Sequence, residues 1–468
     1  MHFFRGNSAL NARENIRVFR NIFKNFSFSE IPLPVFVRQE CLLKIACQGE
    51  SVLHWAFMGK KMGSSLGPIY LVIFLDMLGF GTIIPVIRDM TIEMARNFSW
   101  YDNASPEILA GILMTAYSAS QFLTSPLFGR LSDKYGRRPL LMASVFGNVA
   151  SYALWAVSQS FEVFLASRVV SGITGGNISV AQAYIADVTE RDNRAKAMGM
   201  MGAIFGLGFI MGPFVGALLS SIDLSSWQNS IPLNRFSAIG IFSMVLSAVN
   251  LLWISVALIE PERLKSQGQK VSLGLVALLQ SIRQSNLARL LVVYFLSQLA
   301  FVFMEATLAW HLKDAYQMDT AATGYFFAFM GVIMVLVQGG VYRPLVSRLK
   351  ERKMIWQGLP VAGIALIILP FTATFWMGAI IIAMLAYGMG VSNPSQTSLG
   401  SLYSSEEDQG LNLGIMQGLG ALARILAPVF ATTMYVFWHP APYMLAGVLT
   451  LIALGVSVSL PKPLAVKE

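Results

Sequence analysis

Four ionisable residues interrupt long apolar stretches of the chain, and their types limit the chemistry that the chain could perform. Asp76 and Glu305 are acids, whereas Arg168 and Arg424 are bases. Burial in an apolar medium favours the neutral form of such a group, and a neighbouring opposite charge favours its charged form. A carboxyl group subject to both influences can take up a proton in one conformation and release it in another. We therefore expect Asp76 to be the main proton-coupling residue, with Arg168 as a modulator and Glu305 as a second proton site or a substrate site.

Simpler roles are open for the same residues. Asp76 and Arg424 lie at similar depths in their apolar stretches, so they could form a permanent structural salt bridge. Glu305 lies in the outer part of its stretch, where a carboxylate could reach the aqueous interface. Either arrangement would remove that residue from proton coupling.

Composition places these residues in a membrane protein. Of 468 residues, 55% are apolar and only 13% are charged, which excludes a water-soluble globule of this size and a disordered chain. The two cysteines, Cys41 and Cys47, match no metal-binding or redox spacing. No G-x-x-x-x-G-K-[ST] phosphate loop occurs, and no loop is long enough for a catalytic domain. We expect neither an enzyme nor an ATP-driven pump, and no catalytic residue, cofactor or metal.

Apolar segments long enough to cross a bilayer as helices of roughly 20 residues recur along the chain. Gly and Pro occur inside them, as helices in lipid tolerate. The sequence therefore predicts an all-α integral membrane protein with twelve transmembrane helices, at 66–87, 107–128, 139–157, 161–185, 197–220, 236–258, 287–310, 322–342, 355–373, 376–400, 411–435 and 441–460.

Lys and Arg are distributed unevenly around these segments. One side, which includes both termini, carries 28 of the 34 basic residues, whereas the other side carries four. Because cytoplasmic loops are enriched in Lys and Arg, both termini are predicted to be cytoplasmic. We expect a multi-pass protein of a cell membrane, with the bacterial inner membrane as its location. The net charge of +9 then reflects topology, and no nucleic acid is expected as a partner.

The two halves of the membrane part repeat one another. Residues 71–75 align with 292–296 at an offset of 221, and residues 206–213 align with 421–428 at an offset of 215. Duplicated halves in the same orientation are typical of transporters that rock about a site between them. The predicted domains are a cytoplasmic tail at 1–64, a six-helix half at 65–258, a cytoplasmic linker at 259–286, a second six-helix half at 287–460 and a cytoplasmic tail at 461–468.

Three motifs resemble a known family. The loop after the second segment reads Gly129-Arg-Leu-Ser-Asp-Lys-Tyr-Gly-Arg-Arg-Pro-Leu-Leu141, which is similar to the signature G-x-L-a-D-r-x-G-r-[RK]-x-x-l of the major facilitator superfamily. The fifth segment resembles that family's antiporter motif. The residues that carry this resemblance are Gly199, Gly208, Gly212, Pro213 and Gly216, whereas Ala217 stands where Gly is usual. Residues 75–81 and 183–187 look most like the tetracycline/proton antiporter branch of twelve-span drug exporters.

The residue types of the loop motif also suggest physical roles, independently of the resemblance. Gly129 and Gly136 permit a tight turn at a helix end, and Asp133 is suited to a helix N-terminus. The resemblance implies that Arg137 meets an acid at the end of the fourth segment, here Asp187. These residues would then form a latch that closes the cytoplasmic side in the outward-facing state. The glycines of the fifth segment would let helices approach closely.

The resemblance implies a major facilitator fold with two pseudo-symmetric halves, working by alternating access. Export of a small amphiphilic molecule in exchange for protons is the implied function, by a monomer whose partners are that molecule, protons and the lipid bilayer. The first, fourth, seventh and tenth segments line the cavity in such proteins. This implies substrate contacts by Gln182, Gln298, Asn393 and Gln396.

Two other functions are open on the sequence alone. Substrate binding by Arg168 and Arg424 through a carboxylate would favour a uniporter or symporter for a nutrient or an organic anion. The second function is that of a membrane sensor, which would keep the fold but transport nothing.

Overall fold

The computed structural model describes residues 66–95, 105–189, 191–227, 232–261, 285–404 and 409–461. The predicted tail at 1–64, most of the predicted linker and nearly all of the C-terminal tail lie outside the described residues. Every predicted membrane segment falls on helix within the described ranges, where no strand occurs, so the prediction of an all-α bundle is confirmed. The main helices are α3 (Gly67–Gly81), α4 (Ile87–Ala95), α5 (Pro106–Tyr135), α6 (Arg137–Ala156), α7 (Phe161–Thr174), α8 (Ile178–Val188), α9 (Arg191–Leu219), α10 (Ser237–Ala257), α12 (Ser285–Tyr316), α13 (Thr320–Leu336), α14 (Arg343–Ile368), α15 (Phe375–Leu402), α16 (Gln409–Phe437) and α17 (Ala441–Val458).

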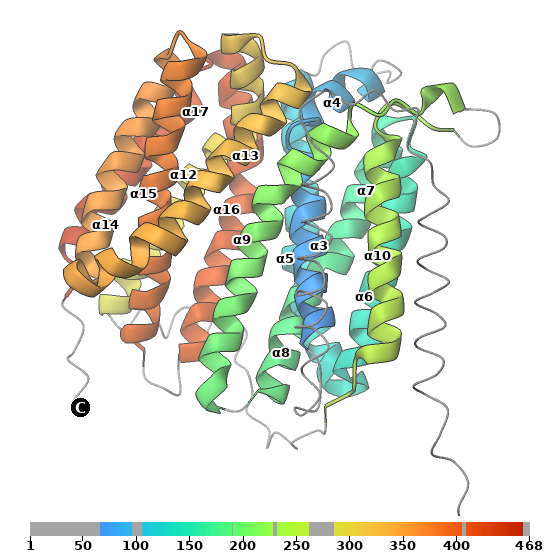
Figure 1. Cartoon of the computed structure of the whole chain (residues 1–468), viewed down its shortest axis with the longest axis horizontal. Helices are drawn as coiled ribbons and strands as arrows, with labels where there is room; N and C mark the ends of the chain where they lie inside the picture. Colours follow the sequence, from blue (N-terminus) through green and yellow to red (C-terminus); the bar gives the residue numbers. More distant parts are fainter. Residues whose placement is uncertain are drawn as a thin grey trace, which may run out of the picture. The chain divides into compact units, whose positions relative to one another are not determined.

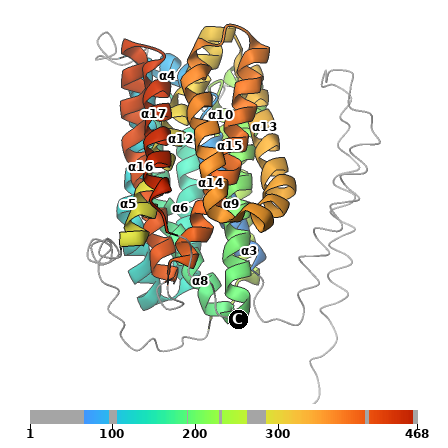
Figure 2. The ribbon, with the colours of Figure 1, turned by 90° about the vertical axis from the view of Figure 1, so that its left-hand side faces the viewer.

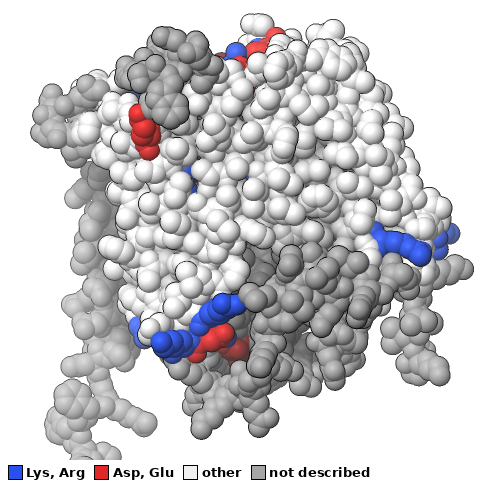
Figure 3. Space-filling view, turned by 180° about the vertical axis from the view of Figure 1, so that it is seen from behind, with Lys and Arg blue, Asp and Glu red and all other residues white. Residues whose placement is uncertain are grey.

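The outer surface of the bundle suits lipid rather than water. Among the described residues, eight helical segments are long and apolar enough to cross a membrane, and one of them, 320–371, contains two predicted spans. Large apolar side chains are exposed on the flanks, such as Val256 at 86% and Leu123 at 73%. In Figure 3, the described Lys, Arg, Asp and Glu side chains gather at the two ends of the face, with a broad uncharged band between them. A soluble monomer rarely exposes so large an apolar surface.

The first predicted span is shorter as a helix than the sequence indicates. Instead of running to residue 87, α3 ends at Gly81, and a turn over 82–86 leads into the short helix α4. Pro85 explains the break, because proline has no N–H to donate and disfavours the helical conformation of the residue before it. In Figure 1, α4 lies at the upper end of the bundle and α8 at the lower end. We call these the α4 end and the α8 end.

A second break divides the fourth span. The helix α7 ends at Thr174, a 3₁₀ turn covers Gly175–Asn177, and α8 follows. A side chain on Gly172 would lie 2.3 Å from the Tyr117 carbonyl oxygen, so glycine lets α7 approach α5 closely. This 3₁₀ turn separates Arg168, on α7, from Asp187, on α8.

The helices form the two halves that the repeat predicts. The first half comprises α3 to α10, and the second half comprises α12 to α17. Across the boundary α5 packs along α16, and α9 packs along α13 (Figure 2). Within the second half, α13 continues through a π-helical segment, Val337–Tyr342, into α14, and the chain changes direction at Lys350, whose φ is 67°.

Candidate functional site

Asp76 lies in the interior of the first half, on α3. Its side chain is 4% exposed, and its Oδ1 accepts a hydrogen bond from Asn148 Nδ2 at 2.7 Å. The Asn148 carbonyl oxygen in turn accepts a hydrogen bond from the Thr174 hydroxyl. Asp76 Oδ2 has no hydrogen bond of standard geometry within the described residues, although the Asn177 side chain lies close enough to interact with the carboxyl group. The carboxyl group is thus held by the Asn148 amide of α6, which in turn is held by the Thr174 hydroxyl of α7.

The permanent bridge between Asp76 and Arg424 is not formed in this structure. The ion pairs within the described residues do not include either side chain. Arg424, on α16, is instead within electrostatic range of Glu305 and of Tyr117. Both groups lie within electrostatic range of Tyr117, but they are not in salt-bridge contact with each other.

Arg168 on α7 carries a buried guanidinium that forms no ion pair with any of the described residues. It is 2% exposed, and its Cζ lies 4.4 Å from the Trp155 ring centroid and 5.2 Å from that of Phe164. Its Nε donates to Ser167 Oγ at 3.4 Å, whereas its Nη2 has no hydrogen-bond partner. Stacking on two aromatic rings stabilises the desolvated cation by about 2 kcal/mol or more, and the free Nη2 leaves a donor for an incoming acceptor.

The Glu305 side chain is buried in the bundle, so the alternative prediction that its carboxylate reaches the aqueous interface is wrong for this structure. Its side chain on α12 is 2% exposed, and Oε1 has no hydrogen-bond partner. The helix α12 runs on to Tyr316, about three turns beyond Glu305, and the burial of the side chain places the carboxyl group inside the bundle. Its roles as a proton or substrate site stay predictions.

The amide candidates for substrate binding lie on three helices. Gln182 on α8, Gln298 on α12 and Asn393 on α15 are half-buried. Gln396 is fully buried, and its Nε2 donates to Ser297 Oγ at 3.3 Å, inside the second half. Since Gln396 already packs within that half, we regard the three half-buried amides as better placed to meet a substrate.

The loop motif assembles at the α8 end. Arg137 Nη1 lies 2.6 Å from Asp133 Oδ1, and Arg137 Nε lies 2.9 Å from Asp187 Oδ2. These pairs join α5, α6 and α8, which all belong to the first half, so in this structure they do not bridge the two halves. The closing role of a latch stays a prediction.

Two details of the loop motif differ from expectation. Gly129 lies inside α5 and makes no turn, and Asp133 lies in the last turn of α5 rather than at a helix N-terminus. The helix continues through Gly129 because one glycine costs only about 1 kcal/mol in a helix interior. The turn is made by Gly136 alone, with φ 108° and ψ 156°.

A residue that the sequence analysis missed explains this turn. Glu260, just after α10, accepts hydrogen bonds from the backbone N–H groups of Arg137 and Arg138, both at 2.7 Å. It thereby caps the first turn of α6, where a carboxylate is favoured. A side chain on Gly136 would lie 2.8 Å from the Glu260 carboxylate. The available signal was an acid directly after the sixth span, within reach of an uncapped helix start.

Replacing Gly136 with alanine is expected to destabilise the protein by about 1–3 kcal/mol, because its backbone conformation is essentially restricted to glycine. Gly129→Ala is the matched control, since the nearest atom to its added methyl group would be Ser179 Oγ at 3.8 Å. Thermal unfolding of the purified variants in detergent measures the difference. Equal midpoints for the two variants would contradict this account of the turn.

The glycines of the antiporter-like motif bring α9 against the backbone of α3. Side chains on Gly208, Gly212 and Gly216 would lie 2.6 Å from Phe74 O, 2.6 Å from Gly81 Cα and 2.0 Å from Thr82 O, respectively. Gly199 also lies on α9, but its surroundings are outside the part of the chain that the structure describes. Pro213 lies inside α9, and its carbonyl oxygen faces Gly324 of the second half.

Comparison with known proteins places this arrangement in a family. A family model described as Major Facilitator Superfamily matches residues 69–428 and 339–467. The chain belongs to the major facilitator superfamily. Major facilitators are transporters of small molecules rather than enzymes, so the predicted family and fold are confirmed.

Two kinds of major facilitator are similar in sequence. The tetracycline resistance protein, class C, of Escherichia coli is 29% identical over 402 residues, which cover 84% of this chain and 96% of that protein. Major facilitator superfamily domain-containing protein 10 of Mus musculus is 28% identical over 408 residues, covering 78% and 86%.

Solved structures agree with the fold. The human organic anion transporter MFSD10 superposes with a TM-score of 0.66 at 26% identity, covering 84% of this chain and 98% of that chain. The D-xylose-proton symporter superposes with a TM-score of 0.67 at 16% identity, covering 86% and 99%, and supports the fold alone.

Proposed function

We propose that this major facilitator exports a small amphiphilic molecule in exchange for protons, with Asp76 as the proton carrier. The observation that supports this proposal is a buried carboxyl group that is held by side-chain amides and takes part in no ion pair within the described residues. A buried acid locked to a base would stay charged through the transport cycle, whereas an acid held by an amide can change its protonation state. The α8 end is cytoplasmic in this proposal, and the protein acts as a monomer in a cell membrane.

A second candidate, transport of an organic anion, is favoured by Arg168. A buried guanidinium stacked on Trp155 and Phe164, with an unused donor, suits an anionic group. The relative MFSD10 is described as an organic anion transporter. The two candidates differ in the charge of the substrate and agree on the transport path.

Purified protein in liposomes with an imposed pH gradient separates them. We expect proton movement, reported by a pH-sensitive dye in the lumen, to depend on an added tetracycline and to be absent from protein-free liposomes. Proton movement or uptake with an aromatic monocarboxylate, and no response to tetracycline, would favour the anion candidate. Substrate uptake without any proton movement would contradict proton exchange.

A further inference from the structure

Each half carries one base–acid dipeptide just after its first predicted span. Arg88 and Asp89 lie at the start of α4, and Lys313 and Asp314 lie in the last turns of α12. Arg88 and Lys313 are 225 residues apart, and so are Asp89 and Asp314. This separation exceeds the repeat offset of 221 at the start of these spans by four residues, which is about one helical turn. Each half therefore presents a base–acid pair at the α4 end, although the two pairs are four residues out of register with the repeat.

The two dipeptides contact one another crosswise. Arg88 Nη1 lies 2.7 Å from Asp314 Oδ1, and Lys313 Nζ lies 2.6 Å from Asp89 Oδ2. This is the pattern of a two-fold interface, in which the base of each partner meets the acid of the other. We call these four residues the crossed clamp.

Neighbouring groups hold the crossed clamp in place. Asp314 Oδ2 accepts a hydrogen bond from the Tyr435 hydroxyl at 2.8 Å, and Asp89 Oδ2 accepts one from the Thr320 hydroxyl at 2.6 Å. The Arg88 guanidinium lies 5.0 Å from the Trp310 ring centroid. The charged side chains of the clamp are only 11–29% exposed. Partly buried, hydrogen-bonded pairs retain more of their attraction than exposed pairs do.

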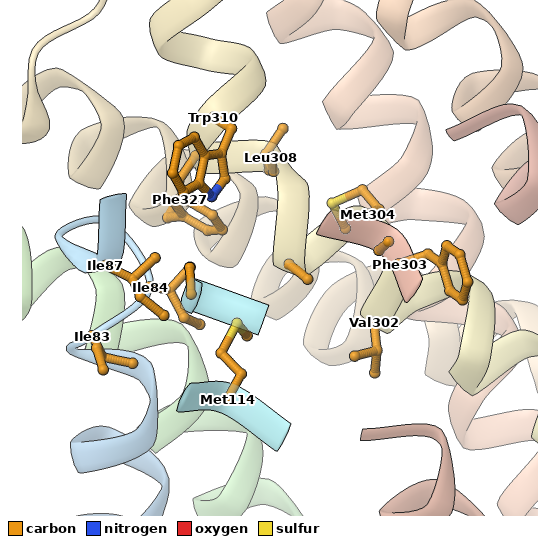
Figure 4. Close-up of a cluster of buried hydrophobic side chains, with 14 of the residues drawn as sticks. Ile83, Ile84, Ile87, Met114, Val302, Phe303, Met304, Leu308, Trp310 and Phe327 are labelled. Atoms are coloured by element: carbon orange, nitrogen blue, oxygen red, sulfur yellow. The ribbon is translucent and has the colours of Figure 1, made fainter. Parts of the chain in front are cut away.

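A buried apolar layer from both halves accompanies the crossed clamp. Ile84 and Ile87 of the first half belong to one cluster with Leu308, Trp310 and Phe327 of the second. Figure 4 shows the two isoleucines directed toward Trp310 and Phe327. The halves are thus in contact at the α4 end through both buried apolar side chains and the ion pairs of the crossed clamp.

Charged contact between the halves is concentrated at this end. Of the ion pairs in the described ranges, the two of the crossed clamp join the halves, and the other two belong to Arg137 within the first half. Opening the α4 end requires α4 to leave α12, which breaks both pairs together.

We propose that the crossed clamp is the gate that closes the α4 end of the transport path, and that both of its pairs must break before that end opens. The gate is independent of which molecule is carried and of proton coupling. Its failure would therefore leave the proposed function standing, and the reverse also holds.

The test measures how often the α4 end opens. Cys41 and Cys47 are replaced with serine, and Ile84→Cys, 2% exposed at present, becomes the reporter in the full chain. A maleimide reacts with this cysteine only when the apolar layer separates. Leu308→Cys, on the opposite half, serves as an independent reporter.

Neutralising both acids with Asp89→Asn and Asp314→Asn should raise the labelling rate of either reporter about tenfold, because two partly buried ion pairs are lost. Glu162→Gln, an exposed acid in the first turn of α7, is the matched control and should leave the rate unchanged. An unchanged rate in the double variant that still elutes as a folded monodisperse species would overturn the proposal.

Charge exchange distinguishes a gate from loss of structure. Asp89→Lys alone and Lys313→Asp alone should each raise labelling, because each leaves like charges facing each other. Combined, they restore an opposite-charge pair and should return the rate to within about threefold of the parent. Labelling of the combined variant as fast as the faster single variant would refute the crossed clamp.

Discussion

Asp76→Asn is expected to abolish substrate-dependent proton movement while the protein stays folded. Asparagine has nearly the same shape, and its carbonyl oxygen can still accept the hydrogen bond that Asn148 Nδ2 donates at 2.7 Å. Its amide cannot take up a proton near neutral pH. An amide cannot replace an intramembrane acid that carries the coupled proton. We therefore expect proton flux in liposomes to fall about 100-fold.

Downhill exchange of the substrate should survive the same substitution, because that reaction needs no net proton transfer. Glu162→Gln, an exposed acid outside the bundle interior, is the control and should retain full proton flux. Unaltered proton flux in Asp76→Asn would remove Asp76 from the mechanism. Glu305, which is also buried, would then be the next acid to replace.

Gly216→Ala is expected to have the largest effect on stability among the motif glycines. An added methyl group would lie 2.0 Å from the Thr82 carbonyl oxygen, which is backbone and cannot rotate away. The helices α9 and α3 would have to separate, at a cost of about 1–3 kcal/mol. A lower midpoint of thermal unfolding in detergent, together with reduced transport, is the expected result.

Gly206 provides the matched control on the same helix. A methyl group added there would meet nothing within 4 Å, so Gly206→Ala should keep or raise stability, by up to about 1 kcal/mol from helix propensity. A similar loss in both variants would show that glycine at these positions acts through helix flexibility rather than through close approach.

The sequence predicts the helices well, because the apolar content of a membrane span dominates every local preference. The spans, the two halves and the family follow from segment lengths, charge bias and motifs. Helix ends are less predictable, as at Gly81, where Pro85 ends the first helix before the apolar segment ends. Gly129 was expected in a turn and lies inside α5, because the apolar pattern does not show where a helix continues beyond the membrane.

Contacts between helices are the part that the sequence does not determine. Depth along a span is readable from residue number, but the direction in which a side chain faces depends on the rotation of each helix. Asp76 and Arg424 share a depth and both lie near Tyr117, yet Asp76 is hydrogen-bonded to Asn148 and is not paired with Arg424. Arg88 and Lys313 are two of the four basic residues that the sequence analysis counted on the less basic side. A base–acid dipeptide just after the first predicted span of each half was the signal that could have paired them.

The charge balance of the crossed clamp bears on how the proposed gate would respond to the membrane voltage. Each half contributes one positive and one negative side chain, so each side of the separating interface is neutral. A voltage does work only on net charge displaced along the field, about 2.3 kcal/mol per elementary charge per 100 mV. Separation of these four residues moves no net charge, so the crossed clamp itself adds no voltage dependence to the opening of this end.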